Sequence, residues 1–140
     1  MHLKKTILLI TFLSISSLAK SENSYEKEFD ETQFIIESQI QAFLDENAEL
    51  AYSYAAPLIK MKFNNPLEFM SMVKNYYEPV YNPKQFYFID ARYFEGAIYH
   101  QLQVISQQDE SFLATYSLIQ DEGKWKISGC AVYPMQKQSI

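Results

Sequence analysis

The polar side chains that could do chemistry gather in the second half of the chain, at alternate positions of extended runs. The set is Asp90, Arg92, Tyr99, Gln101, Gln103 and Tyr116. Side chains at alternate positions point to the same face of a β-strand. A few polar groups among aromatic walls are typical of a small-molecule site. We therefore expect these six side chains to converge in a candidate pocket.

Within this set, Asp90 could act as a base, with Tyr116 or Tyr99 as the proton donor. Arg92 lies two positions from Asp90, and an ion pair between them would keep the carboxylate ionised and unreactive. Amides such as Gln101 bind ligands but transfer protons poorly. The set therefore favours recognition over catalysis, and we assign no catalytic residue.

Cysteine and histidine are scarce, which excludes several kinds of site. Cys130 is the only cysteine, and His100 is the only histidine outside the first few residues. A structural zinc site built on these residue types lacks ligands, and no glycine-rich phosphate loop is present. We expect neither a metal nor a cofactor. Cys130 and His100 form the one conventional nucleophilic pair, but a small buried thiol is the commoner role of a free cysteine.

The first 19 residues have the features of a cleaved signal peptide. Lys4 and Lys5 precede an apolar run over residues 6–18, and a small-x-small site ends at Ala19. The run falls short of the roughly 20 residues that span a bilayer. We expect a periplasmic or secreted protein that begins near Lys20 and has no membrane span after cleavage. The net charge of −5 argues against nucleic acid and anionic membranes as partners.

Three helices are predicted in the first half of the remaining chain. Residues 20–30 form a polar linker, residues 31–135 a single α+β domain and residues 136–140 a tail. The first helix has an apolar stripe that includes Ile36, Ile40 and Phe43. A second helix follows over residues 48–55, and Pro57 ends it or opens a short further turn. A third runs from the capping signal at residues 65–68 to about residue 77.

Four strands follow over residues 85–133, separated by Glu95-Gly96, residues 107–110 and Glu122-Gly123. Helices before strands predict an α+β fold in which three helices pack on a curved four-stranded antiparallel sheet. With even-numbered loops and no bulge, Gln101 pairs with Asp90 and Tyr116, His100 with Ala91, and Tyr116 with Gly129. The helix-facing core then includes Phe112, Tyr116, Trp125 and Ile127, packed against Ile40, Phe43 and Tyr52.

The same register predicts an apolar outer face of the sheet. Its members are Tyr87, Ile89, Leu102, Val104, Leu113, Ile119 and Val132. An exposed patch of this kind usually marks an interface. We therefore predict a homodimer formed through the outer sheet face. Cys130 and His100 also fall on this face, on either side of the strand that carries Ser117.

Several segments resemble a family of short bacterial exported proteins catalogued as a domain of unknown function. The segments are AFL at 42–44, AYSYAAP at 51–57, FMSMV at 69–73, YEPVY at 77–81 and WKISGC at 125–130. The resemblance covers roughly residues 33–133 and implies the nuclear-transport-factor-2-like cone, which is SnoaL-like and cystatin-related, and an envelope location. It brings no catalytic residues, and members of the wider fold differ in function.

These observations lead to one functional expectation and one alternative. We expect a non-catalytic exported module whose cone binds a small amphipathic molecule or a peptide. The alternative is a small cofactor-free lyase or isomerase of the SnoaL-like type that uses Asp90 and Tyr116.

Overall fold

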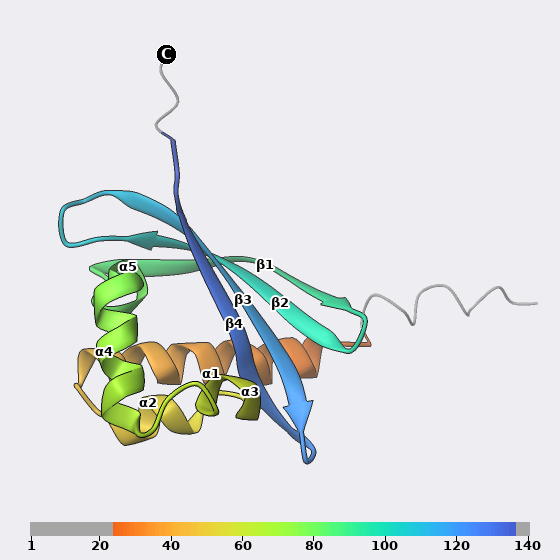
Figure 1. The fold of residues 1–140 in the computed structure, drawn as a ribbon. Helices are drawn as coiled ribbons and strands as arrows, with labels where there is room; N and C mark the ends of the chain where they lie inside the picture. The colour runs from red at the N-terminus through yellow and green to blue at the C-terminus, as the bar shows by residue number, and fades with distance from the viewer. Residues whose placement is uncertain (1–23, 137–140) are drawn as a thin grey trace, which may run out of the picture.

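Helices come first and strands last along the chain, as the sequence predicts (Figure 1). The structure is a computed structural model that describes residues 24–136, so the predicted signal peptide at residues 1–19 lies outside the described residues. The helices are α1 Glu26–Leu44, α2 Ala48–Ser53, α3 Pro57–Lys60, α4 Pro66–Tyr76 and α5 Glu78–Tyr81. The strands are β1 Gln85–Phe94, β2 Ala97–Ile105, β3 Ser111–Asp121 and β4 Lys124–Pro134. The predicted α+β architecture is confirmed.

Helix α1 begins earlier than predicted, because its buried stripe continues towards the N-terminus. The Tyr25 ring stacks on Tyr93 with 4.2 Å between ring centroids, and Phe29 meets the edge of His100. Residues 26–30 are therefore helical, and the prediction of a polar linker over residues 20–30 is wrong for this part.

The ends of the other helices follow their capping chemistry. The Asn65 side chain accepts a hydrogen bond from the Glu68 amide at 2.9 Å and starts α4. The Glu68 carboxylate accepts in return from the Asn64 amide at 3.0 Å, one residue before the predicted partner. The bond from the Asn64 amide, and then a second bond from the Asn64 side chain, lower the pKa of the Glu68 carboxylate. Pro57 opens the one-turn helix α3, which was one of the two outcomes predicted for it.

The sheet is antiparallel with strand order β1-β2-β3-β4. Two-residue turns at Glu95-Gly96 and Glu122-Gly123 have positive φ at both positions, as tight hairpins require. The β2–β3 connection is longer, with five residues between the paired Ile105 and Ser111. The free edge of β4 is partly covered, because the Ala56 amide donates to the Ile127 carbonyl at 2.7 Å.

Two β-bulges change which side chains face the helices. Ile89 is the extra residue in β1, and Ser128 is the extra residue in β4. The predicted pairs His100–Ala91 and Gln101–Asp90 are confirmed. The other two pairs are wrong, because Gln101 pairs with Thr115 and Tyr116 pairs with His100 and Cys130.

The core lies between α1 and the concave face of the sheet. Figure 1 shows α1 running along this face, with α4 and α5 closing one end. Tyr116, Trp125 and Ile127 are buried, as predicted, and pack in one cluster with Ile36 and Ile40. A second cluster joins α1, α2 and α4; it contains Ala42, Phe43, Ala51, Phe69, Met70 and Val73.

The outer face is less apolar than predicted. Leu102 and Val104 are fully buried on the helix side, and Val132 packs against the core. Tyr87 and Ile89 remain exposed on the sheet surface. The apolar patch is therefore smaller than the sequence suggests, and self-association through this face stays a prediction.

Candidate functional site

The predicted polar cluster is divided between the two faces of the sheet. Asp90 and Arg92 form an ion pair at 2.8 Å on the outer face, next to the exposed Gln101. Tyr99 pairs with Arg92 on the same face and is 39% exposed.

Gln103 is also an outer-face residue, and its amide donates to the Ser111 hydroxyl at 3.3 Å. Tyr116 alone points to the inside and is 1% exposed. The six side chains therefore do not converge. The bulge at Ile89 is the physical reason, because it turns Asp90 and Arg92 away from the helices.

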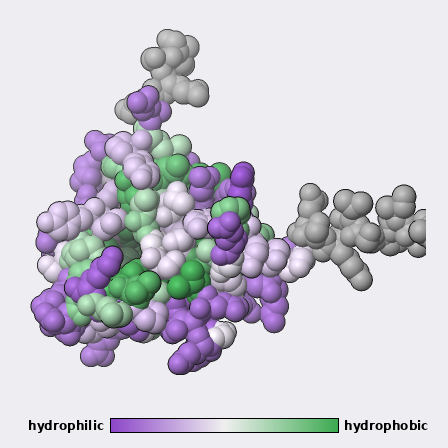
Figure 2. Space-filling view, turned by 45° about the vertical axis from the view of Figure 1, so that its right-hand side comes forward, coloured by the Kyte–Doolittle hydropathy of each residue, from purple (hydrophilic) through white to green (hydrophobic). Residues whose placement is uncertain are grey.

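A cavity of about 290 Å³ lies on the inner side, between the helices and strands β3 and β4. Its walls are mostly aromatic and aliphatic. They include Phe43 of α1, Ile59 of α3, Phe69 and Val73 of α4, and Ile127 of β4. Figure 2 shows hydrophobic side chains gathered around a hollow on the face where β4 meets the helices. This cavity is the candidate functional site.

The local sequence of β4 shapes one wall of this cavity. The bulge at Ser128 turns Cys130 inward, where it pairs with Tyr116. Gly129 follows the bulge, and a Cβ atom there would lie 2.9 Å from the Ser117 hydroxyl oxygen. Ala55 faces the same space with a short side chain. The short Ala55 side chain leaves room in the interior, whereas Gly129 avoids a close contact with Ser117 on the other face of the sheet.

Two polar groups at the base of the cavity are held in their neutral forms. The Tyr116 hydroxyl is buried without a hydrogen-bond partner among the described residues. Burial, and then the neighbouring Cys130 thiol, raise the pKa of Tyr116 well above its ordinary value. Burial likewise raises the pKa of Cys130 to about 12, partly opposed by Tyr116. Neither group is poised to exchange a proton near neutral pH.

The remaining polar groups along the wall differ in how they are engaged. Gln39 is buried, and its amide donates to the Ala51 carbonyl at 3.1 Å, which ties α1 to α2. The Ser128 hydroxyl shares a 2.9 Å hydrogen bond with Ser117. Lys62 is exposed and lines the cavity just after α3. Within residues 24–136, Lys62 forms no ion pair, so its charge is available at the edge of the cavity.

His100 lies on the inner face but does not form a dyad with Cys130. The pairing places Tyr116 between them, and the prediction that both lie on the outer face is wrong. His100 Nε2 is 2.7 Å from the Thr32 hydroxyl oxygen. The same hydroxyl donates a hydrogen bond to the Glu28 carbonyl at 2.7 Å. Burial lowers the pKa of His100 to about 4, partly opposed by the charge of Asp90. His100 is thus a neutral, packed core residue.

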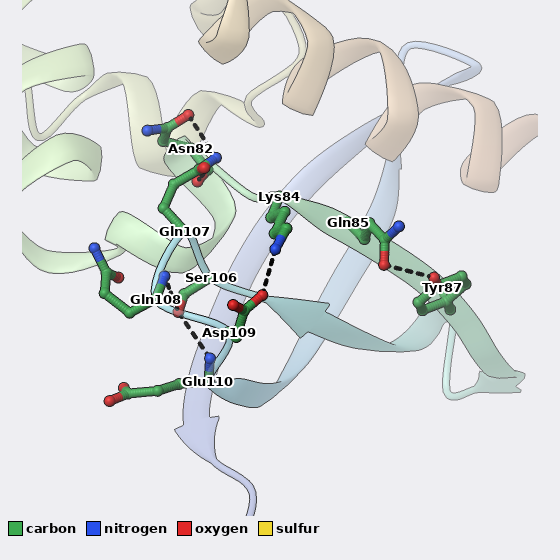
Figure 3. A network of polar contacts seen from close by, with 9 residues as sticks. All are labelled: Asn82, Lys84, Gln85, Tyr87, Ser106, Gln107, Gln108, Asp109 and Glu110. Atoms are coloured by element: carbon green, nitrogen blue, oxygen red, sulfur yellow. Dashed lines mark hydrogen bonds and ion pairs between the residues drawn. The ribbon is translucent and has the colours of Figure 1, made fainter.

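A separate polar network surrounds the β2–β3 connection and is structural (Figure 3). Lys84 pairs with Asp109, and Ser106 accepts hydrogen bonds from the amides of Gln108 and Glu110. These contacts satisfy one another and fix the hairpin against the start of β1. Across residues 24–136, no group of three or more His, Cys, Asp or Glu side chains could hold a metal ion.

Most residues that line the cavity are not among the predicted site residues, of which only Tyr116 lines it. The missed residues include Ile59, Phe63, Met72 and Val73, whose spacing signals burial but not an empty space beside them. One signal was available in β4. A glycine inside a strand often marks a bulge or a close approach, and Gly129 directly follows the bulged residue.

Comparison with known proteins identifies the family. The chain belongs to the family described as Domain of unknown function (DUF4864), whose sequence model matches residues 25–140. No curated protein matches the chain.

Two solved structures show a similar fold. Bd1075 of Bdellovibrio bacteriovorus superposes with a TM-score of 0.55 at 16% identity, over 84% of this chain and 44% of that one. The chain thus spans less than half the length of Bd1075. A designed nuclear-transport-factor-2-like protein superposes with a TM-score of 0.52 at 11% identity, over 76% of this chain and 99% of that one. The fold is the nuclear-transport-factor-2-like cone, as predicted.

Proposed function

We propose that this member of the DUF4864 family is a binding module that holds a small, largely apolar ligand inside its cone. The observation that carries the proposal is the cavity of about 290 Å³ between the helices and strands β3 and β4. Its wall is aromatic and aliphatic, and few of its groups are polar, which is the usual composition of a small-molecule site.

The size of the cavity limits the ligand. The volume is near the lower end of the roughly 300–1,000 Å³ range of small-molecule pockets. At about 30 Å³ for each water in the liquid, it has room for roughly ten water-sized groups. A ligand of about ten non-hydrogen atoms fits this space, whereas a folded partner or a large cofactor does not.

The chemistry of the wall supports binding rather than catalysis. Among the described residues that line the cavity there is no Asp, Glu or His. The raised pKa values of Tyr116 and Cys130 keep both groups neutral. The alternative that pairs Asp90 with Tyr116 has no support, because the ion-paired Asp90 lies on the outer face. A substrate in contact with both Asp90 and Tyr116 would have to extend through the sheet.

We also propose that the module acts outside the cytoplasm. Lys4, Lys5, the apolar run and the small-x-small site before Lys20 support this location. The described helices include none long and apolar enough to cross a membrane. N-terminal sequencing of protein from the periplasmic or culture fraction should show a mature chain that begins near Lys20. Intact Met1 in a cytoplasmic fraction would contradict export.

A titration with 1-octanol, followed by the isoleucine methyl signals in NMR, tests ligand binding. Ile59 and Ile127 line the cavity, whereas Ile89 lies 55% exposed on the outer face. We expect saturable shifts of the Ile59 and Ile127 methyl signals and no saturable shift of Ile89. Equal shifts of all three signals, or none at any, would contradict the proposed function.

A further inference from the structure

Lysines gather beside the cavity in a chain that is acidic overall. The full sequence has 17 acidic and 12 basic side chains. Lys60 lies at the end of α3 and Lys62 just after it, while Lys124 and Lys126 begin β4. Strand β4 packs on α3, and Lys62 lines the cavity. Asp121 lies opposite Lys124 across the β3–β4 turn, and Glu122 lies in that turn, so these carboxylates offset part of the local positive charge. Four lysines against two carboxylates leave this end positive in a chain whose net charge is negative.

Among residues 24–136, these four lysines and Lys74 form no ion pair with a carboxylate. The ion pairs within residues 24–136 are Lys27–Glu31, Lys84–Asp109 and Arg92–Asp90. Lys60 instead lies over the Tyr52 ring, 5.3 Å from its centroid.

Lys126 donates to the Ser53 carbonyl at 2.8 Å. Partial burial lowers its pKa, and the charges of Lys60 and Lys124 lower it further, while Asp121 partly offsets them. Lys60 and Lys124 therefore repel Lys126, and an anion beside these three side chains would relieve this repulsion.

We infer that the ligand of the proposed cavity is a single-chain amphiphile with an anionic head group, whose head lies at Lys62. This inference rests on the proposed function and adds the class of ligand. The apolar tail lies against Phe43, Phe69 and Val73, whose side chains offer no partner to a charged group. The head stays at the opening, where Lys62 is exposed and an anion keeps part of its hydration. A carboxylate, a sulfate or a phosphate head could each pair with Lys62 at this opening.

Tail length follows from the volume of the cavity. Room for roughly ten water-sized groups corresponds to a tail of about eight carbon atoms when the head remains outside. Octanoate is therefore the test ligand. 1-Octanol has the same number of carbon atoms without charge, and octylammonium has the same number with the opposite charge.

The experiment measures dissociation constants for these three ligands from the Ile59 and Ile127 methyl shifts. We expect octanoate to bind most tightly and octylammonium most weakly. Lys62→Ala should weaken octanoate about two- to fivefold, the range expected for one exposed ion pair, and leave 1-octanol unchanged. Lys62→Arg should retain octanoate binding, because the charge remains.

Lys74→Ala is the matched control, because Lys74 is an exposed lysine of α4 that does not line the cavity. It should change neither affinity. Equal affinity for octanoate and 1-octanol, or equal effects of Lys62→Ala and Lys74→Ala, would overturn the anionic head group while the proposed function stands. If neither octanoate nor 1-octanol shifts the cavity methyl signals, the proposed function fails as well.

Discussion

Removing the Tyr116 hydroxyl should stabilise the unliganded protein. That oxygen is buried and makes no well-formed hydrogen bond with the described residues, only a weak contact with the Cys130 thiol, while its ring packs in the core. A buried polar group without a partner costs about 1–3 kcal/mol. Tyr116→Phe removes the group and keeps the ring, so the free energy of unfolding should rise by about 1–3 kcal/mol. For a domain of this size the melting temperature should rise by about 4 °C per kcal/mol.

Tyr52 provides a matched control with the opposite expectation. Its hydroxyl donates to the Lys60 carbonyl at 3.0 Å, and its ring is half-buried. Tyr52→Phe loses this hydrogen bond and should cost about 0.5–1.5 kcal/mol. The same change of residue type should therefore stabilise at one position and destabilise at the other.

Urea unfolding followed by tryptophan fluorescence measures both effects. Trp125 is the only tryptophan and is 9% exposed, so its emission reports on the core without labelling. Unchanged m-values in both variants would show that only stability has changed. A Tyr116→Phe variant that is less stable than the natural protein would mean that the hydroxyl has a partner, and would refute this account of the cavity base.

Four further outcomes follow from the packing. Ile127→Ala should cost about 2–5 kcal/mol in urea unfolding, and a loss under about 1 kcal/mol would place Ile127 on the wrong face. Gly129→Ala should cost about 1 kcal/mol because its Cβ meets the Ser117 hydroxyl, and less in a Ser117→Ala background. Between pH 6.5 and about 4, falling pH should lower stability by up to about 1.4 kcal/mol per unit in the middle of this window, because the unfolded chain protonates His100 and the folded one does not. His100→Gln should flatten this slope, and an unchanged slope would contradict the assignment. The Cys130 thiol should react with a disulfide reagent at pH 8 much more slowly in the folded protein than after unfolding, since burial raises its pKa to about 12, and equally rapid labelling of both states would contradict the raised pKa.

The sequence was sufficient for the architecture, because helical and strand periodicities differ and the capping and turn signals were explicit. Asn65 and Pro66 start α4 as expected, and Glu95-Gly96 and Glu122-Gly123 form the tight turns. These features are local, so a single sequence contains them.

The face of each strand was harder to predict, because it depends on irregularities with weak local signatures. Because of the bulge at Ile89, the β2 side chains face the side of the sheet opposite to the one predicted. The odd-numbered β2–β3 connection shifts the register once more, so the β3 side chains face the predicted side. These two errors cancel at Tyr116, which faces the helices as predicted. The bulge at Ser128 had no such compensation, so Cys130 was placed on the wrong face.

The cavity could not be predicted, because an empty volume depends on how separate elements fail to fill the space between them. Phe69 and Val73 have the helical spacing of ordinary core residues, and the structure shows that they also border an open space. Conversely, Asp90 and Arg92 are predicted site residues, but in the structure they form an ion pair on the surface. In this chain, the residues whose types suggested a site lie outside the cavity, with the exception of Tyr116.

Native mass spectrometry of the protein purified from its own host tests the central claim most directly. Ile59→Trp should fill the cavity, whereas Leu58→Trp adds the same ring to a side chain that is 70% exposed on the same helix. We predict that the natural protein and Leu58→Trp retain a small bound molecule, and that Ile59→Trp loses it. A bound mass retained equally by Ile59→Trp, or no bound mass in any of the three proteins, would contradict the cavity as the ligand site.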